Sequence, residues 1–282
     1  MKRFPLITAA LLVLVSCQER TPEPAPQQLV VEGWIESGGH PAVTVTRSLS
    51  VVVGKEVTAG DIAHNIIRRA KVTVNDGTRD YPLEGHIDTD VFPPYRYTTD
   101  ALTGEVGKTY TLRVEYQDYV VTGETTIPEP VPIDRAYVRE VVDGIATLVC
   151  TFTDPATPGN YYKVFTKTKG KDGDYIPIAF GLVADEDLDQ SASEIFIFSN
   201  MRMMQSYINP NIEEGDVVSI KLRTMTRESY DFWAAHDVRV NGTAFSLRPQ
   251  DTQQLTTLQG GLGYWIGYGA TEPVPVTAAA GP

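Results

Sequence analysis

Apolar and polar side chains alternate along Tyr110-Thr111-Leu112-Arg113-Val114-Glu115-Tyr116, and this pattern is the clearest indication of the fold. A period of two is typical of a β-strand that has one face in a core and the other in water. Residues 119–126 form a second strand-like stretch directly after it. The sequence therefore predicts an all-β fold around this point.

The same pattern continues toward the N-terminus. Three earlier segments are rich in apolar or alternating residues: 29–35, 42–46 and 70–74. Asp76-Gly77 follows the last of them, and Asp-Gly is a strong signal for a tight turn. Strands of this length and spacing suit an immunoglobulin-like sandwich, which takes about 100 residues. We expect an immunoglobulin-like β domain over residues 29–127.

A proline-rich segment divides the chain. Residues 128–134 carry alternate prolines, which remove ladder donors and keep the backbone extended, so we interpret them as a linker. A second β domain is predicted over 135–270, with one short helix near 227–239 and Thr226 as its N-cap. The fold class is thus two β-sandwich-like domains. Residues 271–282, TEPVPVTAAAGP, are expected to be a disordered tail.

The N-terminus has the layout of an export signal. Lys2 and Arg3 precede an apolar run that is too short to span a bilayer. Leu14-Val15-Ser16-Cys17 then resembles the lipobox of bacterial lipoproteins, so residues 1–16 are predicted to be a signal peptide and Cys17 to carry lipid. Residues 17–28 are predicted to be a proline-rich tether. The alternative is a secreted protein whose signal happens to end at a cysteine.

Composition excludes one class of partner. The 282 residues include 24 Lys+Arg against 36 Asp+Glu, a formal net charge of −12. Such a surface repels phosphate backbones, and no basic stripe offsets it, so nucleic acid is not expected as a partner. Beyond the signal no apolar stretch approaches the roughly 20 residues of a membrane helix.

The motifs of common enzymes and metal sites are missing from the sequence. The four histidines are scattered, no Gly-x-Ser-x-Gly elbow is present, and the glycines of 260–269 lack the spacing of a nucleotide-binding loop. Cys150 sits in an apolar run with no cation beside it, which favours a core residue over a nucleophile. We therefore expect no enzyme activity, cofactor or metal.

Two aromatic-rich segments leave a choice open. Tyr264 and Trp265 lie in the glycine-rich stretch 260–269, and Tyr95 and Tyr97 lie in a loop that begins Val91-Phe92-Pro93-Pro94. One interpretation places these rings in the core, with the glycines allowing close backbone approach. The other makes them an exposed surface for a ligand or a partner.

Several of these motifs, in this order, resemble one family. They are the lipobox, the segments 30–35, 70–77 and 107–114, Thr126-Ile127-Pro128, and the C-terminal landmarks 229–232 and 260–264. The family comprises Bacteroidota outer-membrane lipoproteins, catalogued as a domain of unknown function and typically encoded beside TonB-dependent receptors. The resemblance implies an accessory lipoprotein that binds or presents a nutrient to such a receptor, and it supplies no catalytic residues.

The resulting hypothesis is a non-enzymatic protein anchored by lipid to the outer membrane, with the cell-surface face favoured. Its expected partners are a TonB-dependent receptor and a small-molecule, glycan or peptide ligand. Two alternatives remain: an envelope hydrolase that acts on glycan or peptide, and a structural component of the envelope.

Overall fold

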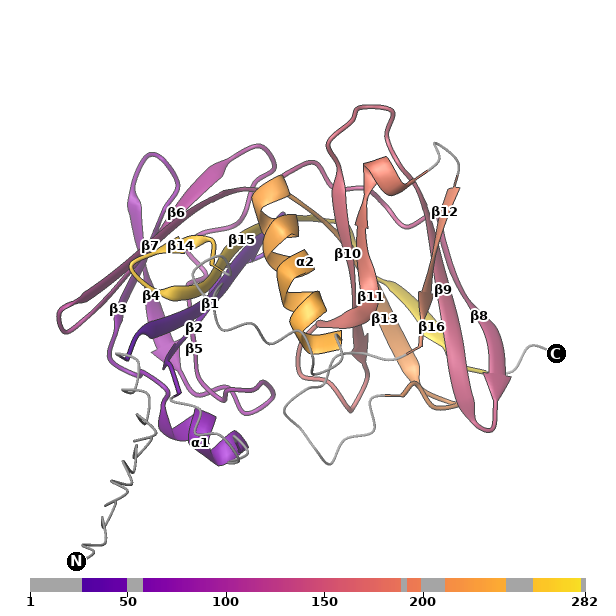
Figure 1. Cartoon of the computed structure of the whole chain (residues 1–282), viewed down its shortest axis with the longest axis horizontal. Helices are drawn as coiled ribbons and strands as arrows, with labels where there is room; N and C mark the ends of the chain where they lie inside the picture. The colour runs from indigo at the N-terminus through magenta and orange to yellow at the C-terminus, as the bar shows by residue number, and fades with distance from the viewer. Residues whose placement is uncertain (1–26, 50–57, 189–191, 199–210, 242–255, 280–282) are drawn as a thin grey trace, which may run out of the picture.

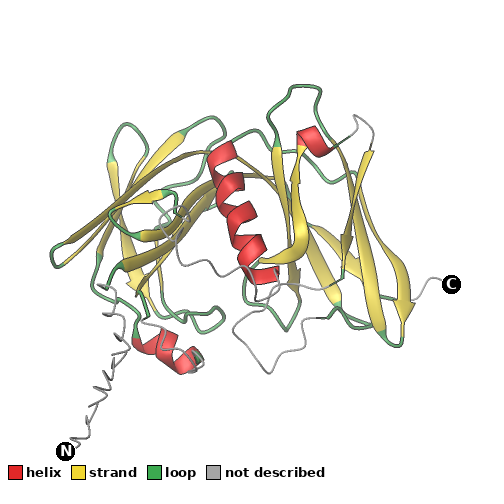
Figure 2. Ribbon diagram, viewed as in Figure 1, coloured by secondary structure: helices red, strands yellow, loops and turns green. Residues whose placement is uncertain are grey.

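The computed structural model describes residues 27–49, 58–188, 192–198, 211–241 and 256–279. The predicted signal peptide, Cys17 and the tether up to residue 26 lie outside the described residues. The all-β prediction is confirmed (Figures 1 and 2).

The first half of the chain contains these elements: β1 (Leu29–Glu36), β2 (Ala42–Arg47), α1 (Ala59–His64), β3 (Lys71–Asn75), β4 (Asp80–His86), β5 (Arg96–Thr98), β6 (Thr109–Tyr116) and β7 (Tyr119–Thr126). The rest contains β8 (Arg135–Val142), β9 (Ile145–Thr153), β10 (Tyr161–Thr168), β11 (Ile176–Ala184), η1 (Asp185–Asp187), β12 (Ala192–Ile197), β13 (Val217–Met225), α2 (Arg227–Asn241), β14 (Leu258–Gln259), β15 (Leu262–Ala270) and β16 (Val274–Thr277).

β6 has the alternating burial that its sequence predicts. Tyr110, Leu112 and Val114 on β6 are fully buried, while the residues between them face outward. β6 pairs with β3 on one side and with β7 on the other, both antiparallel. The buried residues join inward-facing side chains of β1, β2 and β3 in the core of the first half.

The second half is a sandwich of two layers. β8, β9 and β12 form one sheet, in the order β12-β9-β8, and β10, β11, β13 and β16 form the facing layer. The core between the layers includes Phe152 from β9, Tyr162 from β10 and Ile220 from β13. Cys150 is fully buried in this core, as the sequence predicted.

One sheet runs through both halves, and this corrects the assignment of the end of the predicted 135–270 domain to the second half. β15 runs parallel to β1 from Val30↔Leu262 to Glu36↔Tyr268 and also pairs with β13. β14 pairs with β7. The end of the predicted second domain therefore completes the first half, because β1 has a free edge that β15 fills.

The glycine-rich segment serves close backbone packing. A Cβ at Gly263 would overlap the carbonyl oxygen of Val31, and one at Gly267 would press on that of Thr126. Gly263 also has a φ of +104°, which side-chain-bearing residues rarely adopt. The interpretation of these glycines as sites of close backbone approach is confirmed.

The prediction of a disordered tail over residues 271–282 is wrong for its described part. Val274–Thr277 form β16, which pairs antiparallel with β13. Val276 and Ala278 are buried, at 8% and 0% exposure. The segment is ordered because its alternating valines meet an unpaired edge of β13, and sequence alone does not show that edge.

The predicted helix near 227–239 is α2, which lies across the junction of the two halves (Figure 1). Thr226 stands before it, and its Oγ1 accepts a 3.4 Å hydrogen bond from the Ser229 amide. Phe232 and Trp233 pack against Ile266 of β15 in a third apolar cluster. Within the described part of the chain, no helix is both long and apolar enough to cross a membrane.

Candidate functional site

A cavity of about 510 Å³ lies where the two halves meet. One wall is the face of β1, β2 and β15 on the side of α2. The other walls are the loop of residues 90–96 and the hairpin of residues 171–177. Small-molecule sites commonly have volumes of about 300–1,000 Å³ and form between domains. This cavity is therefore the candidate functional site.

The alternation of β1 builds the first wall. Every second side chain of the strand lines the cavity: Val30, Glu32 and Trp34. Leu29, Val31 and Ile35, on the other face of the strand, point into the core of the first half. Register then sets the neighbours of Glu32, which are Tyr264 on β15 and Thr44 on β2. A carboxyl group thus lies between a phenol and a hydroxyl on one face of the sheet.

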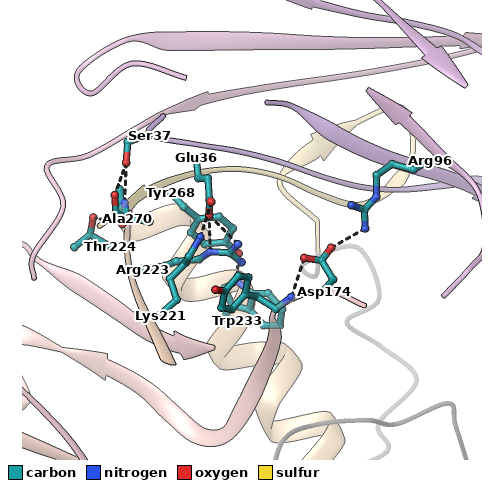
Figure 3. A network of polar contacts seen from close by, with 12 residues as sticks. Glu36, Ser37, Arg96, Asp174, Lys221, Arg223, Thr224, Trp233, Tyr268 and Ala270 are labelled. Carbon is teal, nitrogen blue, oxygen red and sulfur yellow. Dashed lines mark hydrogen bonds and ion pairs between the residues drawn. The ribbon is translucent and has the colours of Figure 1, made fainter. Parts of the chain in front are cut away.

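The loop of residues 90–96 meets the hairpin of residues 171–177 directly. Arg96 donates to Asp174 at 2.6 Å, and the arginine side chain is only 18% exposed (Figure 3). Gly173 lies against the backbone of Asp90, where any Cβ would overlap the Asp90 carbonyl group. Lys167 Nζ also donates to the Gly173 carbonyl at 2.7 Å. These contacts hold the two outer walls of the cavity together.

Glu32 carries the main electrostatic feature of the cavity. Its side chain is exposed to the open space of the cavity, and the walls of the cavity surround it on the other sides. Desolvation raises the pKa of its carboxyl group above the ordinary 4.5, and the charge of His236 on α2 offsets only part of this effect. Burial, together with the charge of Glu32, also raises the pKa of Tyr264 well above its usual value.

The aromatic side chains of the cavity are Trp34, Phe92, Tyr175 and Tyr264. The Arg96 guanidinium lies over the Trp34 ring, 5.1 Å from its centroid. One face of that indole is therefore already occupied by a cation of the protein, which Asp174 neutralises.

A buried ion triad lies behind the cavity and joins the halves. Glu36 at the end of β1 accepts from Lys221 at 2.7 Å and from Arg223 at 2.8 Å, both on β13 (Figure 3). Burial opposes ionisation of Glu36, but the charges and hydrogen bonds of Arg223 and Lys221 outweigh it and lower the pKa of Glu36. The Tyr175 ring lies 4.4 Å from Lys221 Nζ and links the triad to the cavity wall.

Three of the four predicted binding aromatics are core residues, which corrects that prediction. Exposure is 9% for Tyr95, 2% for Tyr97 and 1% for Trp265. Tyr97 donates to the carbonyl of Ile67 at 2.8 Å, and the Trp265 indole donates to that of Tyr110 at 2.9 Å. Partners inside the fold hold these rings because each ring sits on the core side of its strand.

Tyr264 alone of the four lines the cavity. Three further lining residues were not predicted from the sequence: Glu32, Trp34 and Arg96. Glu32 had a usable signal, because it is the one charged residue in the predicted strand 29–35 and shares a face with Trp34. Arg96 lies within the aromatic loop that the sequence had singled out, between the two tyrosines.

Other reactive groups are held in structural positions. Burial raises the pKa of the Cys150 thiol to about 12, which suppresses the thiolate form. No group of His, Cys, Asp and Glu suited to a metal ion occurs among the residues with described positions. The cavity has three other carboxylates: Asp174 is paired with Arg96, Asp172 accepts from the Thr168 amide at 2.7 Å, and Asp90 lies in the loop wall.

Fold and site together define a class: an all-β protein of two halves joined by one continuous sheet, with a ligand-sized cavity at the junction. The chain belongs to the family described as "Domain of unknown function (DUF4249)", whose model matches residues 18–273. No curated protein matches the sequence.

Solved structures add little to this assignment. A "Cytokine receptor complex - Crystal form 1A" chain is 10% identical with a TM-score of 0.26, over 89% of this chain and 97% of that one. A DUF4785 family protein from Legionella pneumophila is 14% identical with a TM-score of 0.21, over 70% and 52%. Similarity at this level carries no argument about function.

Proposed function

We propose that this protein is a non-enzymatic ligand-binding lipoprotein, anchored through Cys17 to the outer membrane at the cell surface, which presents a nutrient to a TonB-dependent receptor. The observation that carries the binding role is the junction cavity of about 510 Å³. The anchor rests on Leu14-Val15-Ser16-Cys17, and the receptor rests on the resemblance of the sequence to the lipoprotein family.

The cavity suits binding better than catalysis. A glycosidase or peptidase would need convergent acid and base groups, and Asp172 and Asp174 are committed to contacts within the fold. Glu32, Asp90 and the aromatic residues remain to meet a ligand. The contacts between the cavity walls also favour a preformed site, because a site that needs little ordering loses less free energy on binding.

The test is purification of the tagged protein from its native outer membrane in mild detergent, followed by mass spectrometry of what stays bound. We expect a TonB-dependent receptor in near-stoichiometric amount, and its loss in a Cys17→Ala variant. Recovery of the lipoprotein alone would refute stable association with a receptor. Turnover of a glycan or peptide by the purified protein would instead establish the hydrolase alternative.

A further inference from the structure

We infer that the junction cavity selects a small organic cation, an ammonium-bearing molecule with an apolar body. This inference rests on the proposed ligand-binding role and names the chemical class of the ligand. It follows from the charges that the described lining residues leave unmatched and from the aromatic rings beside them.

The positive charges of the lining are already matched or point away. Arg96 is paired with Asp174. Lys171 contacts Glu213 at 2.6 Å and Asp216 at 2.8 Å.

Arg47 is in register with Leu29, a core residue, so its side chain lies on the opposite face of the sheet from Glu32. Its guanidinium donates there to the Tyr116 hydroxyl at 3.1 Å. None of the three lining cations of the described chain is therefore available to an anionic ligand.

The negative charge of Glu32 is not matched in the same way. The described residues give its carboxylate no salt bridge within 4 Å, and the charge of His236 offsets only part of its desolvation. The side chain of Glu32 is exposed to the cavity, so an ammonium group that enters can reach the carboxylate and form a charge-assisted hydrogen bond with it.

The apolar part of the ligand has surfaces to meet. Tyr264 stands beside Glu32 in register, and Trp34 follows on the same face of β1. Aromatic faces attract ammonium groups and cover apolar bodies. One such pair already exists in the cavity, because the Arg96 guanidinium lies 5.1 Å from the centroid of the Trp34 ring. A carboxylate flanked by aromatic rings favours a cation over a neutral sugar or an anion.

The test compares probes that differ in charge but not in shape. Choline is paired with 3,3-dimethylbutan-1-ol, its neutral isostere, and phenethylamine is paired with 2-phenylethanol, with 3-phenylpropanoate as the anionic probe. Binding to the full mature chain in detergent is measured by titration calorimetry. We expect at least one cation to bind about tenfold or more tightly than its neutral partner, and the carboxylate not to bind.

The variant Glu32→Gln keeps the shape of the side chain and is expected to abolish this preference. Glu124→Gln removes an exposed carboxylate on β7, outside the cavity lining, and should leave the preference unchanged. Circular dichroism of both variants checks that they fold.

Equal binding of cation and neutral partner, or a preference that survives Glu32→Gln, would overturn the inference while leaving the cavity a binding site. Absence of binding by every probe at millimolar concentration would also overturn it. The receptor purification judges the proposed function separately, so the two failures are distinguishable.

Discussion

The buried triad of Glu36, Lys221 and Arg223 makes a measurable prediction about the junction. The three side chains are 18%, 10% and 5% exposed. Replacement of Glu36 by Gln keeps the volume but leaves two cations without their counter-charge. Removal of one partner from a buried pair costs about 3–5 kcal/mol. The glutamine oxygen still accepts one hydrogen bond, so we expect a loss of about 3 kcal/mol in the free energy of unfolding.

The chain contains a matched control. Glu115 also contacts one lysine and one arginine, Lys71 at 3.0 Å and Arg113 at 2.6 Å, but these two side chains are 74% and 50% exposed. Exposed pairs contribute only about 0–1 kcal/mol. Glu115→Gln should therefore change the free energy of unfolding by less than about 1 kcal/mol.

The assay is equilibrium urea denaturation of the wild type, Glu36→Gln and Glu115→Gln at pH 7. The pKa of Glu36 is lowered in the fold, so its contribution is complete above the ordinary 4.5 and is lost as pH falls through the folded-state pKa. The difference between wild type and Glu36→Gln should shrink over that acidic range. Equal effects of the two substitutions at pH 7 would refute the claim that burial makes the junction triad contribute more to the free energy of unfolding than an exposed pair does.

Three further predictions address β16, the cavity walls and Glu32. A chain that ends at Glu272 lacks β16 and its buried side chains, so its free energy of unfolding should fall by about 2–4 kcal/mol, and an unchanged value would restore the disordered tail. Gly173→Ala forces the hairpin away from the loop and should lower the free energy of unfolding by about 1–3 kcal/mol in urea denaturation. Gly60→Ala, whose Cβ meets only ordinary contacts, should be neutral or stabilising, and equal destabilisation by both alanines would contradict the close contact at Gly173. Because the folded-state pKa of Glu32 is raised, its ionised carboxylate destabilises the fold above pH 4.5. Glu32→Gln should therefore raise the thermal midpoint of unfolding at pH 7, and this increase should disappear below pH 4.5. An increase that does not depend on pH would contradict the raised pKa.

Local pattern predicted the strands because alternation is a property of neighbouring residues. The apolar positions of β6 needed only their spacing to be placed in a core. α2 was predicted for the same reason, from its amphipathic stripe and the N-cap Thr226. Strands and helices that depend on neighbouring residues could therefore be predicted from the sequence.

Pairing between strands that are distant in the sequence could not be predicted. β15 lies more than 200 residues from β1 along the chain, and nothing in either segment alone specifies their parallel register. The assignment of residues 258–270 to the second domain and the predicted disordered tail were both wrong for this one reason. Both placed C-terminal segments by their position in the sequence, whereas free strand edges of β1 and β13 decide where these segments go.

The cavity depends on the same distant pairing. Glu32 becomes a candidate binding residue only when β15 brings Tyr264 beside it and the 171–177 hairpin closes the space above. Tyr95 and Tyr97 point the other way because their strand and loop face the first core, a fact that an aromatic-rich sequence does not contain. The face of β1 that carries Glu32 and Trp34 becomes a cavity wall only because the second half of the chain covers it. The junction that the triad stabilises is therefore also the structure that creates the site, and substitutions that loosen the triad should weaken ligand binding without touching the cavity lining.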